Sequence, residues 1–206
     1  MSIVTRYKSS LSAYSLILVN LFPLYAVLFL KWTLFSIMFL YWLENVIVGF
    51  YNIFKMAKAK GTQTLNFTLN GKPASECGNG AVIGFFILHY GIFMTVHGVF
   101  VFVLFGPPTM APADFTWAFL LLFISHGISY FYNFIGRKEY ETVSLSQQMA
   151  KPYSRLVIMH ITILAGGFAA KVIGEPIWAL MVMIVVKTAI DLGSHMNEHK
   201  AEPKNA

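Results

Sequence analysis

The sequence has few charged residues and a single cysteine. Charged side chains make up 12% of the 206 residues, whereas apolar side chains make up 57% and phenylalanine alone occurs 19 times. A soluble domain carries about a quarter charged residues, so this chain lacks the charge to cover its surface in water. The composition excludes a soluble enzyme, a disordered chain and a nucleic-acid-binding module. It predicts an integral membrane protein whose partner is the lipid bilayer.

Cys77 is the lone cysteine, which excludes an internal disulfide and any zinc or iron–sulfur cluster built from several cysteines. The net charge of +6 does not require a nucleic-acid partner, because Lys and Arg collect in the cytoplasmic loops of membrane proteins.

Six apolar segments are long enough to cross a bilayer, which takes about 20 residues of helix. They cover residues 11–30, 32–54, 81–105, 115–135, 153–170 and 176–192. The first is longer than the apolar core of a signal peptide and no small-residue cleavage site follows it, which favours a retained helix. The sequence thus predicts a single all-α domain, a polytopic bundle of six transmembrane helices, with a loop at 55–80 and a tail at 193–206.

Basic residues gather on one set of connections. They precede the first segment, follow the second and the fourth, and recur in the tail, whereas the other connections hold Lys31 and Lys171. This asymmetry predicts that both termini and the 55–80 loop are cytoplasmic. The expected location is a bacterial inner membrane.

Three polar features lie outside the predicted spans or at their ends. The Asn70-Gly71 pair is compatible with a small hairpin, and a flexible linker is the alternative. Residues 137–151 are expected to lie on the membrane surface as a short helix. Arg155, at the inner boundary of the fifth segment, is expected to meet lipid phosphate.

Ionisable side chains inside spanning segments are costly, so their presence needs a reason. Those in or near the predicted spans are Glu44, His89, His97, His126, His160, Lys187, Asp191 and His195. Counting about 1.5 Å of rise per residue places four histidines and both acids between the midplane and the inner rim. His97 falls toward the outer side and is not expected to join them.

Helical spacing predicts which of the polar residues share a face. Asp191 follows Lys187 by one helical turn on the same face, and the two are expected to pair. The expected polar seam comprises Asn45 and Asn52 in the second segment, His126 and Asn133 in the fourth, and Lys187, Asp191 and His195 in the sixth. The asparagines are interpreted as helix–helix contacts rather than ligands.

The leading functional hypothesis is a transition-metal centre, with Zn, Cu, Fe or Mn, for redox or hydrolytic chemistry on a membrane-soluble substrate. Imidazole and carboxylate groups ligate these ions. Glu44 is expected to act as a general base or a further ligand. The expected metal ligands are His89, His126, His160, Asp191 and His195. Haem held by two histidines is a further option, but nothing in the sequence singles out which two histidines would hold it.

Two alternatives come from other functional classes. In the first, the same residues relay protons in a small proton- or ion-coupled transporter or channel. In the second, the chain is a membrane assembly subunit whose polar residues only hold helices together. Whether the protein is an enzyme stays open, and so small a bundle is compatible with a homodimer.

Four short strings contain many of these polar residues. They are Tyr41-Trp42-Leu43-Glu44-Asn45, His89-Tyr90-Gly91-Ile92-Phe93, Ser125-His126-Gly127 with Asn133 two turns on, and Asp191-Leu192-Gly193-Ser194-His195. Together they resemble a bacterial family of six-helix membrane proteins of unknown function. The resemblance covers most of the chain and implies no activity, cofactor or catalytic residue.

Overall fold

The computed structural model describes residues 29, 32–62, 68–69, 71–73, 76–106 and 112–173. Its long helices are α2 (Leu34–Lys58), α3 (Asn79–Phe105), α4 (Pro112–Ser129) and α5 (Leu145–Ile173). The prediction of an all-α fold is confirmed. The predicted first and sixth spans lie outside the described residues, and so do Lys187, Asp191 and His195. The count of six spans therefore stays a prediction.

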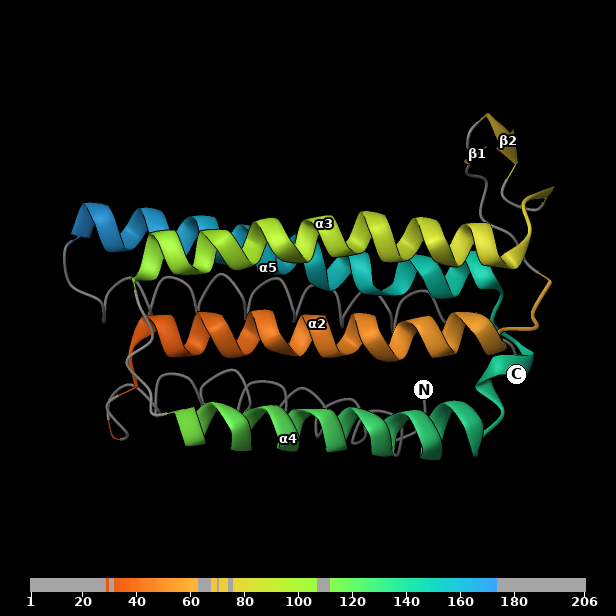
Figure 1. Cartoon of the computed structure of the whole chain (residues 1–206), viewed down its shortest axis with the longest axis horizontal. Helices are drawn as coiled ribbons and strands as arrows, with labels where there is room; N and C mark the ends of the chain where they lie inside the picture. Colours follow the sequence, from red (N-terminus) through yellow and green to blue (C-terminus); the bar gives the residue numbers. More distant parts are fainter. Residues whose placement is uncertain are drawn as a thin grey trace, which may run out of the picture.

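The four helices lie side by side, and each runs antiparallel to the helix before it (Figure 1). Helix α2 is central: α4 packs on one side of it, and α3 and α5 pack on the other. Helices α3 and α5 also contact each other. This arrangement gives α2 contacts with all three other helices, so a side chain on α2 can bring α4 and α5 to one site.

Within the part of the chain that the structure describes, three helical segments are long and apolar enough to cross a membrane: Leu34–Lys58, Asn79–Phe105 and Phe115–Ile135. The last of these joins α4 to η2 (Tyr130–Ile135), a short π-helical stretch. The outer faces of the helices expose large apolar side chains that a soluble protein would bury, among them Leu88, Val103, Trp117, Leu121 and Phe168. Exposed apolar surface on this scale fits contact with lipid. These features support a membrane protein.

Helix α5 begins at Leu145, eight residues before the predicted start of the fifth span. Ser144 caps it, since the Ser144 hydroxyl accepts from Gln147 N at 3.2 Å while Gln147 Oε1 accepts from Ser144 N at 3.0 Å. Such reciprocal bonds satisfy amide groups that a helix start otherwise leaves free. The expected surface helix at 137–151 is therefore wrong, because its second half forms the first turns of α5.

The segment before α5 is tied to the end of α2. It contains a single 3₁₀ turn, η3 (Glu139–Glu141). Lys60 N donates to Tyr140 O at 2.8 Å, and Gly61 N donates to Val143 O at 2.9 Å. These backbone bonds fix the start of α5 beside the end of α2, and so set the register in which the two helices pack.

The 55–80 loop contains the hairpin, not the linker. Strands β1 (Thr68–Leu69) and β2 (Lys72–Pro73) pair antiparallel across Asn70-Gly71. Gly71 has a φ of 78°, which glycine adopts without the steric cost that a side chain adds.

Close contacts also fix α2 against α3. The ring of Tyr90 lies on Gly49, where a Cβ would clash with it. The ring of Trp42 lies on Gly98, and its Nε1 donates to Met94 O at 2.7 Å. Two large rings on two glycines leave little freedom for one helix to slide along the other.

Candidate functional site

Glu44 joins three helices at the middle of the bundle. Its Oε1 accepts a hydrogen bond from Nη2 of Arg155 on α5 at 2.6 Å. The same oxygen lies 3.5 Å from Nε2 of His126 on α4. Glu44 itself belongs to α2, so one carboxylate links the central helix to both flanking ones.

The three side chains of this site are partly buried. Glu44 is 28% exposed, His126 is 25% exposed and Arg155 is 40% exposed. Charges at such positions in an apolar bundle are costly unless they are paired, and Glu44 and Arg155 supply opposite signs. Arg155, which was expected to meet lipid phosphate, therefore contacts Glu44 instead. We call Glu44, Arg155 and His126 the central site.

A histidine pair links α3 to α5. His97 Nδ1 lies 2.6 Å from Phe93 O, and His97 Nε2 lies 2.9 Å from His160 Nδ1. A carbonyl oxygen only accepts, so Nδ1 of His97 bears a proton. In neutral His97, Nε2 then accepts the bond that His160 Nδ1–H donates.

The expectation that His97 stays apart from the inner histidines is wrong. The error arises because α5 begins earlier than predicted. His160 comes 15 residues after Leu145, where α5 begins, and His97 comes 18 residues after Asn79, where α3 begins. Helices α3 and α5 begin at the same end of the bundle (Figure 1). At about 1.5 Å per residue, His160 lies about 22 Å from the start of α5 and His97 about 27 Å from the start of α3. They are therefore at similar heights and meet.

His89 bonds to a different partner. Its Nδ1 lies 2.8 Å from the Tyr153 hydroxyl of α5, and its ring stacks on Phe85. Of the predicted ligands, the structure thus brings His126 to Glu44, but it places His89 and His160 in separate pairs.

The predicted metal ligands lie only partly within the described residues. Among the described residues, no three His, Cys, Asp or Glu side chains are grouped closely enough to hold an ion. Asp191 and His195 lie outside those residues, and the metal centre stays a prediction.

The two asparagines of α2 face polar contacts of different kinds. Asn45 donates from Nδ2 to Tyr41 O at 2.8 Å, and its backbone O accepts from the Tyr90 hydroxyl at 3.0 Å. Asn52 accepts at Oδ1 from Gln148 Nε2 of α5 at 2.7 Å. In η2, Asn133 donates to the hydroxyl of Ser129, the last residue of α4, at 3.3 Å. Of the expected seam, Asn52 thus contacts α5, whereas the side chains of Asn45 and Asn133 bond within their own segments. The seam as a whole, with its residues in the sixth segment, stays a prediction.

A match to one family model covers nearly the whole chain. The model is described as a family of unknown function (DUF6498), and it matches residues 3–206. The chain belongs to the DUF6498 family. This confirms the resemblance to an uncharacterised family, whereas bacterial origin and a six-helix count stay predictions. No curated protein and no solved structure matches the chain.

Sequence reasoning did not foresee that α5 presents two polar residues of this DUF6498 chain to α2. They are Gln148 and Arg155, seven residues apart. Seven residues are almost two full helical turns, so the spacing alone places both on one face. The signal was in the sequence, but starting the fifth span at Tyr153 left Gln148 in a loop and Arg155 at a boundary.

Proposed function

We propose that this DUF6498 protein moves protons across the membrane, with Glu44 as the group that binds the proton. The observation that carries the proposal is the position of Glu44, whose Oε1 contacts Arg155 on one neighbouring helix and His126 on another. Ionisable residues inside apolar bundles are typical of proton pathways and ion-coupled transport.

The chemistry of the central site suits proton exchange. A ring nitrogen of histidine can both donate and accept a proton, so His126 can deliver a proton to the nearby Glu44 oxygen or take one from it. Protonated Glu44 no longer balances the positive charge of Arg155. Since Glu44 bonds to α5 and lies beside α4, a change in its charge weakens the attraction between α2 and both partners at once.

Through this coupling, proton binding at Glu44 changes how the helices pack. A bound proton shifts a conformational equilibrium only as far as its affinity differs between the two states. The ion pair supplies that difference, because it favours the packed arrangement when Glu44 is charged and loses its effect when Glu44 is neutral.

The membrane placement that goes with this function is six spans with both termini cytoplasmic, in a bacterial inner membrane. Its support is the grouping of basic residues at one end of the bundle, where α2 ends and α5 begins. The basic residues there include Lys55, Lys58, Lys60, Arg137 and Lys138. Excess Lys and Arg mark the cytoplasmic side.

The test is proton flux into liposomes that contain the purified protein and a trapped pH-sensitive dye, with the membrane potential clamped by potassium and valinomycin. Wild-type protein is expected to dissipate an imposed pH gradient faster than empty liposomes do. Glu44→Gln keeps the size and the hydrogen-bonding oxygen but cannot bind the proton, and it is expected to return the rate to that of empty liposomes.

Glu76→Gln is the matched control, because Glu76 is exposed and lies outside the central site. It is expected to conduct as wild type does. A wild-type rate equal to that of empty liposomes, or full conduction by Glu44→Gln, contradicts the proposal.

A metal centre is the second candidate, and it rests on one observation: two predicted ligands, Glu44 and His126, lie 3.5 Å apart. In this case the further ligands would come from Asp191 and His195. Arg155 argues against it, since a guanidinium bonded to the same carboxylate oxygen repels a cation.

A further inference from the structure

Polar side chains repeat along the interface between α2 and α5. On α5 they are Gln148, Arg155 and Thr162, at seven-residue intervals on one face. On α2 they are Glu44, Asn45 and Asn52. We call these six residues the α2–α5 stripe. Two of its contacts cross between the helices, Gln148 with Asn52 and Arg155 with Glu44.

Four buried atoms of the stripe have no hydrogen-bond partner among the described residues. They are Asn45 Oδ1, Asn52 Nδ2, Gln148 Oε1 and Thr162 Oγ1. The side chains are almost fully buried, with exposures of 0%, 3%, 2% and 0% in that order. Buried polar atoms are nearly always bonded to protein or to water, so four in one interface call for an explanation.

Pro152 removes one backbone donor from α5 at the same place. It lies inside α5 and is buried. Proline has no N–H, so the backbone carbonyl of Gln148, four residues earlier, lacks the donor that a regular helix would give it. In membrane helices such freed carbonyls are satisfied by neighbouring side chains or by ordered water.

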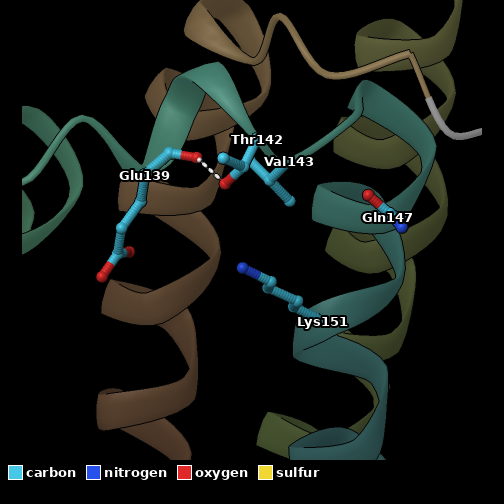
Figure 2. Close-up of a pocket in the computed structure, with 5 residues that line it drawn as sticks. All are labelled: Glu139, Thr142, Val143, Gln147 and Lys151. Atoms are coloured by element: carbon cyan, nitrogen blue, oxygen red, sulfur yellow. Dashed lines mark hydrogen bonds between the residues drawn. The ribbon is translucent and has the colours of Figure 1, made fainter. Parts of the chain in front are cut away.

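An open pocket lies at the end of the bundle where the stripe begins. It has a volume of about 450 Å³ and is lined by Glu139, Thr142, Val143, Gln147 and Lys151 (Figure 2). Gln147 and Lys151 belong to the first turns of α5 and flank Gln148 in sequence. Gln147, which lines the pocket, directly precedes Gln148 of the stripe, so the pocket and the stripe meet at the start of α5.

We propose that the α2–α5 stripe is a water-filled path by which protons pass from this pocket to Glu44. The inference rests on the proposed function, since it supplies the proton that Glu44 binds. Gln148 and Asn52 hold water at the entrance through the oxygen and nitrogen atoms that their mutual bond leaves free. From there Arg155 and Glu44 lie seven residues further along α5 and eight residues back along α2, or about 10–12 Å.

The structure gives the path a polarity. The entrance lies at the basic end of the bundle, whereas Glu44 lies near the middle of α2. A short chain of hydrogen-bonded waters spans this distance, and each water needs two to four polar partners. The free atoms of the stripe are partners of this kind.

The first test measures water access without relying on transport. In a Cys77→Ser background, single cysteines replace Gln148, Asn52 or, as a matched control, Leu156. Leu156 is also buried on α5, at 5% exposure, but lies in the apolar core. The probe is aminoethyl methanethiosulfonate, which reacts with thiols that water reaches. The cysteines at 148 and 52 are expected to react at least about tenfold faster than the one at 156, as an ionised thiol requires water.

The second test blocks the path and leaves the central site intact. Asn52→Leu combined with Gln148→Leu replaces both partners of a buried bond by apolar groups of similar size, which is close to neutral for stability. This double variant is expected to fold and to lower Glu44-dependent proton flux about tenfold, or about 1.4 kcal/mol of barrier.

The outcomes separate the two proposals. Equal reactivity at positions 148, 52 and 156, or unchanged flux in the folded double variant, overturns the water path but leaves Glu44 as the proton site. Absence of flux in the wild type overturns the proposed function, and the cysteine reactivities then decide alone whether the stripe is hydrated.

Discussion

Removing Arg155 is predicted to cost more stability than removing both Arg155 and Glu44. Arg155→Met keeps most of the side-chain length but leaves the Glu44 carboxylate without the guanidinium that now lies 2.6 Å away. Breaking a buried pair by deleting one partner strands an uncompensated charge, whereas replacing both partners by neutral groups does not.

The magnitude follows from the distance and the exposure of the pair. At 2.6 Å the attraction is about 6 kcal/mol for an effective dielectric constant of about 20, and about 1.6 kcal/mol in bulk water. Desolvation of both ions offsets much of it, and side-chain exposures of 28% and 40% bring the environment nearer to the weaker limit. We therefore expect a coupling of about 1–3 kcal/mol between the two substitutions.

The assay is a double-mutant cycle of Arg155→Met, Glu44→Gln and their combination, with the free energy of unfolding measured in mixed micelles titrated with denaturing detergent. The double variant is expected to be more stable than the two single losses added together. Arg155→Lys, which keeps the charge, is expected to retain most of the wild-type stability. A coupling below about 0.5 kcal/mol would refute the reasoning, because it would mean that the pair adds nothing beyond a surface ion pair.

Three further predictions concern packing and metal. Gly49→Ala is expected to lower the free energy of unfolding by about 1–3 kcal/mol, and with it the melting temperature, since the new methyl group meets an aromatic ring of α3. Gly84→Ala, whose methyl group meets no described atom within 4 Å, is the control, and an equal loss in both variants contradicts the prediction. Trp42→Phe is expected to cost about 1 kcal/mol in the same measurement through loss of its bond to Met94 O, and no loss would show that this bond is not stabilising. If the metal hypothesis holds, elemental analysis of protein purified without chelator will find about one equivalent of Zn, Cu, Fe or Mn that His126→Ala lacks; protein that stays metal-free after incubation with these ions rules that hypothesis out.

The individual helices could be read from the sequence because apolar length alone identifies them. The expected span at 115–135 coincides with the helical segment Phe115–Ile135. The third span differs from α3 by two residues at its start, and the second differs from α2 by two residues at its start and four at its end. The 145–152 turns of α5 could not be read in this way. They are polar, and the serine cap and the packing against α2 hold them in the helix instead.

The sequence by itself determined that the chain belongs in a membrane and that Glu44 and His126 lie deep in their helices. Only the tertiary structure decided which polar residues are neighbours. Helical periodicity fixes a residue's face and height on its own helix, but not which helix that face meets. The pairing of Glu44 with Arg155, and of His97 with His160, depends on the packing of α5 against α2 and α3 and on where α5 begins.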